Sequence, residues 1–234
     1  MSLTLKLALA PVLVAQGLIT RARTPRLPEA EGARSGAVGR GAPLRLLVAG
    51  DSSAAGVGVR HQRDALAQPL ATALAGLVAR RVHWQLLART GLDTAQTLDW
   101  LRGEAALAAD LAVIVTGVND ITSQVASTRA VAAREALANR LRNAVGVRHV
   151  VFTPVPPMQA FPALPQPLRW MAGADAARHN RALREWAATR RDVSCVELQL
   201  CAAGMAVAAD GFHPGADTYR RSAEGLARHL AEFA

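Results

Sequence analysis

Short apolar runs alternate with longer segments of helical periodicity from Arg45 to the end of the chain. Apolar runs predict five strands, at 46–49, 82–88, 111–115, 149–153 and 193–196. The segments that follow them predict helices, at 64–79, 94–107, 128–145, 174–191 and 216–233. The run Leu111–Val115 is wholly apolar, as in a strand that is buried on both faces. This alternation predicts an α/β fold in which helices cover both faces of a parallel sheet.

The N-terminal region has a different pattern. Residues 3–19 are mostly apolar, but the uninterrupted part, Leu7–Ala15, is far shorter than the ~20 residues that a membrane-spanning helix needs. Residues 24–43 are rich in Pro, Gly, Ala and charge, which is typical of a linker. We therefore expect an apolar segment and linker over 1–43 and one domain over 44–234.

Three interpretations of the apolar segment remain open: an export signal, a helix that lies on a membrane surface, and a helix that packs on the domain. Arg21, Arg23 and Arg26 follow it directly, and basic residues in this position oppose export. We therefore expect a cytoplasmic location with peripheral membrane contact through this segment. Export to the periplasm is the alternative.

Charge and cysteine content exclude some classes of protein. The chain carries 27 Lys and Arg against 18 Asp and Glu, a formal charge of +9. The basic residues are scattered, so we expect no nucleic-acid partner, although the positive surface favours anionic substrates or lipid. Two cysteines, Cys195 and Cys201, make neither a disulfide scaffold nor a zinc-ligand set. Cys195 lies in an apolar run and is predicted to be a buried structural thiol, and the redox state of the two cysteines stays open.

Polar residues follow the predicted strands at positions where parallel sheets bind ligands, beyond the carboxyl ends of the strands. Ser52, after the first strand, could project its hydroxyl over the sheet edge and offer its N–H to an oxyanion, or Asp51 and Ser52 could simply cap a helix. Gly91, after the second strand, permits close approach of its backbone to a ligand, or forms a simple turn.

Two further groups lie after the third strand and before the last helix. Asn119 offers a neutral amide donor to an oxyanion and Asp120 is expected to fix the loop, with an Asx turn as the alternative. Asp210 stands three residues before His213, so its carboxylate can reach the ring Nδ1 and hold the imidazole as a base. No other histidine has such a partner.

Glycines after the first strand also suggest a nucleotide-binding loop, but that interpretation fails. Gly56 and Gly58 lack a third glycine at the required offset, and no acidic residue ends the second strand. The Gly-Lys-Ser/Thr sequence of a phosphate-binding P-loop is also absent.

Taken together, the four segments resemble the signature blocks of the SGNH (GDSL-type) hydrolase family. In order, they are Gly50-Asp51-Ser52, Gly91, Gly117-Val118-Asn119-Asp120 and Asp210-Gly211-Phe212-His213-Pro214. They extend over nearly the whole folded body, and one departure is Ser53, where the family name expects Leu.

This resemblance implies a three-layer α/β/α, flavodoxin-like fold with a five-stranded parallel sheet. It implies ester hydrolysis through an acyl-enzyme, without a metal or organic cofactor. Ser52 would be the nucleophile, His213 the base and Asp210 the acid of a triad. The oxyanion hole would consist of the N–H groups of Ser52 and Gly91 and the Asn119 amide.

The substrate class stays open at this level. We expect a small-molecule ester with a short-to-medium acyl chain, or one like a lysophospholipid. The proline-rich segment Pro154–Trp170 carries large apolar residues and forms either a lid or acyl-pocket wall, or a loop packed on the core: Met158, Phe161, Leu164, Leu168 and Trp170. The alternatives are a carbohydrate acetylesterase and a non-catalytic binding protein on the same fold.

Overall fold

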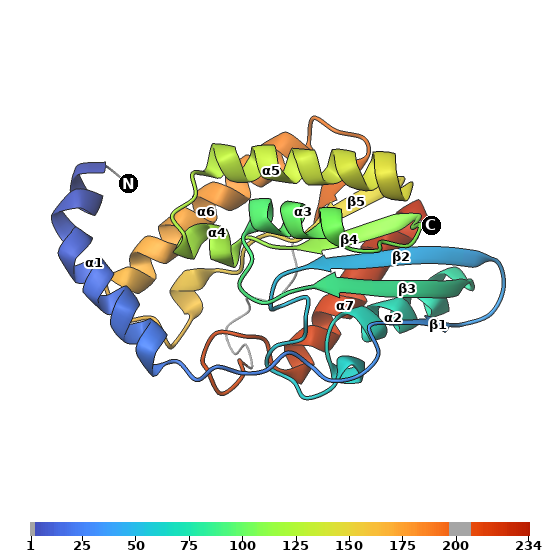
Figure 1. The fold of residues 1–234 in the computed structure, drawn as a ribbon, viewed down its shortest axis with the longest axis horizontal. Helices are drawn as coiled ribbons and strands as arrows, with labels where there is room; N and C mark the ends of the chain where they lie inside the picture. The colour runs from blue at the N-terminus through green and yellow to red at the C-terminus, as the bar shows by residue number, and fades with distance from the viewer. Residues whose placement is uncertain (1–2, 197–206) are drawn as a thin grey trace.

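A parallel sheet forms the centre of the protein (Figure 1). The computed structural model describes residues 3–196 and 207–234, and within these residues the sheet has six strands in the order β1-β3-β2-β4-β5-β6. Five of them are parallel, as predicted: β2 (Pro43–Gly50), β3 (Arg81–Ala88), β4 (Leu111–Val115), β5 (His149–Phe152) and β6 (Val193–Cys195). The sixth, β1 (Ser35–Val38), is added antiparallel to β3 at the edge.

Helices cover both faces of the sheet, so the predicted three-layer α/β/α fold is confirmed (Figure 1). One face is covered by α2 (Ala67–Val78) and α7 (Ala216–Leu230), and the other by α3 (Thr94–Gly103), α5 (Ser127–Arg140) and α6 (Leu168–Ala187). Side chains alternate along β2, because successive residues of a strand point to opposite faces. Leu46 and Val48 therefore pack in the core under α2 and α7, and Leu47 and Ala49 pack in the core under α3, α5 and α6.

Several helix boundaries differ from the predicted ones. The first predicted helix begins as a 3₁₀ turn, Gln62–Asp64, before α2, and the third ends as a π-helical turn, Leu141–Val145. Helix α6 begins earlier than predicted, at Leu168 directly after Pro167, because proline is compatible with the start of a helix. The remaining short elements are α4 (Val118–Thr122) and 3₁₀ turns at Met158–Ala160 and Ala231–Phe233.

The N-terminal region is partly integrated into the domain. The expected linker, 24–43, contains β1, and Ala30 within it is buried. Before it, helix α1 (Leu3–Arg23) contacts the amino end of α6, where the Gln16 side chain donates to the Gln166 carbonyl at 2.6 Å and accepts from the Leu168 N–H at 3.1 Å. Within the described residues, no helix combines the length and the apolar character that crossing a membrane requires.

Candidate active site

Ser52 follows directly after the end of β2, where the chain turns sharply out of the sheet. Gly50, the last residue of this strand, has φ +155°, and a Cβ there would lie 2.0 Å from the carbonyl oxygen of Val115 in β4. Because a side chain at this position would collide with β4, only glycine fits. The chain leaves the sheet directly after Gly50, and Ser52 lies at the carboxyl edge of the sheet. A series of turns follows Ser52, in place of the helix start considered from the sequence.

Ser52, His213 and Asp210 form a continuous hydrogen-bonded chain, although 161 residues separate Ser52 from His213. Ser52 Oγ lies 2.8 Å from His213 Nε2, and His213 Nδ1 lies 2.5 Å from Asp210 Oδ2. Because an ionised carboxylate can only accept, Nδ1 carries the proton and Nε2 can accept from the serine hydroxyl. The structure thus brings together the three residues that the sequence suggested, in the order of a nucleophile, base and acid.

The environment of Asp210 keeps this carboxyl group ionised. Burial of the side chain would by itself raise its pKa, but hydrogen bonds from the His213 ring and from the N–H groups of Phe212 and His213 outweigh burial and lower the pKa below its ordinary value. Both N–H groups donate to Oδ1 at 3.0 Å. The carboxylate therefore fixes the orientation of the imidazole and can stabilise its protonated form.

Gly58 allows the loops that carry Ser52 and His213 to approach each other. Its φ is +107°, and a Cβ there would lie 2.3 Å from the carbonyl oxygen of Pro214. The glycines at 56 and 58 therefore have a packing role in the structure, which explains why they occur without the rest of a nucleotide-binding motif.

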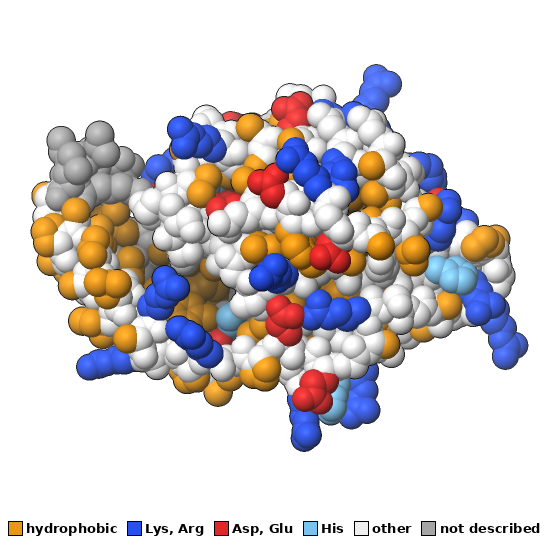
Figure 2. All heavy atoms as spheres, in the orientation of Figure 1, with side chains coloured by type: hydrophobic (Ala, Val, Ile, Leu, Met, Phe, Trp, Pro, Cys, Tyr) orange, Lys and Arg blue, Asp and Glu red, His pale blue; other side chains and the backbone are white. Residues whose placement is uncertain are grey.

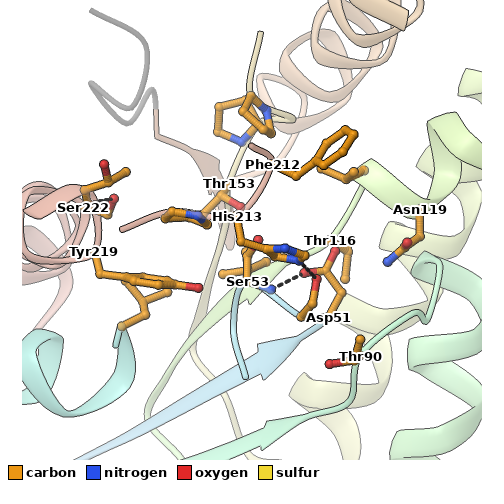
Figure 3. Close-up of a pocket in the computed structure, with 18 of the residues that line it drawn as sticks. Asp51, Ser53, Thr90, Thr116, Asn119, Thr153, Phe212, His213, Tyr219 and Ser222 are labelled. Carbon is orange, nitrogen blue, oxygen red and sulfur yellow. Dashed lines mark hydrogen bonds between the residues drawn. The ribbon is translucent and has the colours of Figure 1, made fainter. Parts of the chain in front are cut away.

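Gly91 and Asn119 line the same cavity as Ser52. Gly91 follows β3 with φ +87°, and Asn119 lies in the first turn of α4, from which its amide points toward the pocket (Figure 3). Asn119 Nδ2 donates to the carbonyl oxygen of Leu92 at 2.9 Å, which joins the two loops. An amide nitrogen has two N–H donors, so the second is available to an oxygen atom bound in the cavity.

Asp120 fixes the same pair of loops from beneath, as expected. Its carboxylate accepts from the N–H of Thr94 at 3.0 Å and from the Thr94 hydroxyl at 2.7 Å. The guanidinium of Arg134 donates to it at 3.3 Å, and both side chains are only 1% exposed. The sequence pattern does not indicate this role for Arg134, because an arginine within a helix is normally solvent-exposed.

Glu29 is a second residue whose role the sequence pattern does not indicate. Its Oε1 accepts from the N–H and from the hydroxyl of Thr90, both at 2.7 Å, directly beside Gly91. Glu29 also pairs with Arg34, which donates to the carbonyl oxygen of Ala88 at 2.8 Å. The segment expected to be a linker therefore holds the loop of Gly91, and no periodicity in the sequence indicated this contact.

The model of the GDSL-like lipase/acylhydrolase family matches residues 48–221. The chain belongs to this family. The match includes all five residues of the proposed triad and oxyanion hole, and membership supports an ester-hydrolysing enzyme. No curated protein sequence matches the chain at a significant level.

Several solved structures share the fold at low sequence identity. The lipase Lip_vut3 from a goat rumen metagenome superposes with a TM-score of 0.65 and 18% identity, covering 82% of this chain and 98% of its own. A carbohydrate acetylesterase family member from Sinorhizobium meliloti gives 0.59 and 20%, covering 81% and 98%. The aryl esterase of M. smegmatis gives 0.61 and 15%, covering 82% and 100%. At these identities the likeness shows the fold alone.

The cavity of this GDSL-family chain has a volume of about 240 Å³ and a mostly apolar lining. Phe161 and Phe212 pack edge to face at a centroid distance of 5.7 Å on its wall, next to Pro154 and Pro156. In Figure 3, His213 lies between Asn119 on one side and Tyr219 and Ser222 on the other, so the cavity extends to both sides of His213. Figure 2 shows it as a hollow beside α1 with a histidine side chain inside.

The proline-rich segment combines two of the roles considered for it. Met158, Phe161 and Leu164 are buried in an apolar cluster with residues of α6, so the segment packs on the core. Its residues Pro154, Pro156 and Phe161 also form the pocket wall.

Asp51 contributes less negative charge beside Ser52 than an ordinary carboxylate would. Its side chain is buried and accepts from the Ser53 N–H at 3.0 Å. Burial raises the pKa of Asp51 to about 7, with the charge of Asp120 acting in the same direction. Near neutral pH this group is therefore partly protonated.

The structure describes one of the two cysteines. Cys195 is half-buried at the end of β6, less covered than predicted, and Cys201 lies outside the described residues. No group of histidine, cysteine and acidic side chains suited to a metal ion occurs in the part of the chain that the structure describes.

Proposed function

We propose that this protein is a serine esterase that hydrolyses carboxylic esters of small molecules through an acyl-enzyme. The observation that carries the proposal is the hydrogen-bonded chain from Asp210 through His213 to Ser52, at the wall of an apolar cavity. Ser52 is the nucleophile, His213 the general base and acid, and Asp210 the group that orients the imidazole.

The reaction proceeds in two steps, the acylation of Ser52 and the hydrolysis of the acyl-enzyme. Ser52 Oγ attacks the ester carbonyl carbon while His213 Nε2 takes the hydroxyl proton. The N–H groups of Ser52 and Gly91 and the amide of Asn119 bind the oxyanion. The intermediate then expels the alcohol, which leaves with the proton from His213. A water molecule, deprotonated by the same nitrogen, attacks the acyl-enzyme. The acid is then released as Ser52 Oγ leaves and takes back the proton from His213.

The size and lining of the cavity favour a short-to-medium acyl chain. Its volume of about 240 Å³ is below the ~300–1,000 Å³ of pockets for drug-sized ligands. Phe161 and Phe212 offer apolar contacts to the acyl carbons. A longer chain would have to extend out of the cavity mouth.

The test compares Ser52→Ala with the matched control Ser53→Ala, using chromogenic esters of increasing acyl length and an alkyl phosphonate that traps nucleophilic serines. Ser52→Ala should lose activity by on the order of 10⁴-fold or more and take up no phosphonate. Ser53→Ala should keep both properties. Full activity in Ser52→Ala, or phosphonate attached to another residue in the wild type, would show that the assignment is wrong.

The acyl-length series also separates the substrate classes. A maximum at short or medium chains supports the proposed substrate. Exclusive hydrolysis of acetyl groups on sugars would instead indicate a carbohydrate acetylesterase. Stoichiometric binding of an ester without turnover would indicate a binding protein.

A further inference from the structure

The exposed side of helix α1 is apolar. No charged residue occurs between Ala8 and Thr20. The residues that turn away from the domain include Val12, Val14, Leu18 and Ile19, whose exposed fractions are 47, 61, 64 and 51%. Trp170, two residues after the point where Gln16 contacts α6, is 48% exposed. We call these five residues the apolar patch.

Helix α1 lacks the polar outer side of a helix on a water-soluble surface, and its partly covered side carries Leu9 and Leu13 together with polar residues. Its partly covered side includes the polar residues Gln16 and Thr20, and both ends of the Gln16 amide are bonded to the backbone at 166 and 168. A surface helix in water normally directs apolar side chains to the domain and polar ones to solvent. The orientation of α1 therefore indicates that an apolar medium or partner covers its outer side.

Positive charge borders the apolar patch. Arg21, Arg23 and Arg26 are exposed at and just beyond the end of α1, and no acidic residue precedes Glu29 in the chain. Among the described residues, no carboxylate pairs with these three arginines. Figure 2 shows apolar side chains over α1, basic side chains near its end and the hollow of the cavity beside it, all on one face.

We propose that the outer side of α1 binds the surface of an anionic lipid bilayer. The apolar patch enters the boundary between headgroups and acyl chains, Trp170 lies at headgroup level, and the three arginines contact lipid phosphates. A formal charge of +9 attracts such a surface and repels a second copy of the chain, which favours lipid over self-association. Binding in this orientation would put the cavity close to amphiphilic esters in the membrane, a consequence that rests on the proposed function.

The test is co-sedimentation of the full chain with vesicles of phosphatidylglycerol and phosphatidylcholine, compared with phosphatidylcholine alone. The charge variant is Arg21→Gln/Arg23→Gln/Arg26→Gln. Its matched control is Arg81→Gln/Arg191→Gln/Arg228→Gln, exposed arginines near the opposite, amino-terminal ends of the strands. The apolar variant is Leu18→Ser/Ile19→Ser, with the exposed Leu77→Ser on α2 as its control.

We expect the wild type to sediment with the anionic vesicles and to be released by high salt. The charge variant should bind roughly 100-fold more weakly and the apolar variant at least about tenfold more weakly, while both controls bind as the wild type does. Melting temperature and hydrolysis of a soluble short-chain ester should be unchanged in both variants, which shows that the domain is folded. Ser52→Ala should bind vesicles normally, so failure of the proposed catalysis would not affect this result.

Three outcomes would overturn the proposal. The first is absence of vesicle binding by the folded wild type. The second is concentration-dependent dimerisation that Leu18→Ser/Ile19→Ser abolishes, which would assign the apolar patch to a second copy. The third is recovery from cells of a processed chain without α1, measured by intact mass, which would identify the helix as an export signal.

Discussion

The buried ion pair between Asp120 and Arg134 allows a quantitative test of how the loops that carry Gly91 and Asn119 are held. Both side chains are 1% exposed and their closest atoms lie 3.3 Å apart. Within the described residues, Nε and Nη1 of Arg134 are buried and have no hydrogen-bond acceptor. The attraction and the hydrogen bonds of this pair therefore offset only part of the free-energy cost of removing both charges from water.

The expected magnitudes follow from this burial. Asp120→Asn leaves the guanidinium charge without its partner and should lower the free energy of unfolding by about 3–5 kcal/mol. Arg134→Met leaves the carboxylate with only its bonds from Thr94 and should also destabilise the domain, by about 3 kcal/mol. In the double variant neither member of this pair is charged, so its stability should return to within about 1 kcal/mol of the wild type.

The assay is urea unfolding of all four proteins, followed by circular dichroism. An identical cycle on the exposed pair Arg45–Asp110, with Arg45→Met and Asp110→Asn, serves as the control and should show a far smaller coupling than the buried pair, because solvent screens its charges. The reasoning is refuted if the losses at 120 and 134 add within about 0.5 kcal/mol, since additive losses mean that the two groups act independently. The side-chain amide introduced by Asp120→Asn can still accept from Thr94 through its carbonyl oxygen, so the double variant should keep its esterase activity within a few-fold.

Three further predictions concern catalysis and pH dependence. Asn119→Ala should lower kcat by ~10²-fold or more with little change in KM, because the lost donor acts mainly on the transition state; a change in KM alone, measured by steady-state kinetics, would contradict this. Glu29→Gln weakens the contacts to Thr90 and should lower kcat about tenfold with KM nearly unchanged, since each lost charge-assisted bond is worth about 1 kcal/mol or more; an unaltered kcat would show that the Gly91 loop is held by other contacts. Burial lowers the pKa of His149 and of His229, so the unfolded chain takes up protons that the folded chain does not. The free energy of unfolding should therefore fall as the pH drops below about 6.5, and His229→Gln should make this fall shallower in melting curves recorded over that range.

The sequence by itself determined the alternation of strands and helices and the positions of the chemical groups. Apolar periodicity depends only on neighbouring residues, so Leu111–Val115 is a strand with the same bounds in the structure. Because the carboxyl ends of parallel strands meet at one edge, residues after three strands and before the last helix were expected to converge. Ser52, Gly91, Asn119 and His213 do line one cavity.

Only the tertiary structure decided the contacts that hold these groups in place. Glu29 reaches Thr90 across 61 residues, and Arg134 is buried against Asp120 from a neighbouring helix. Strand β1 forms only because β3 offers it a free edge. The local sequence pattern does not indicate such partners, since the energies of these contacts come from burial and hydrogen bonds between distant segments. For the same reason, the sequence left the role of α1 open, and the inward orientation of Gln16 is what distinguishes its two sides.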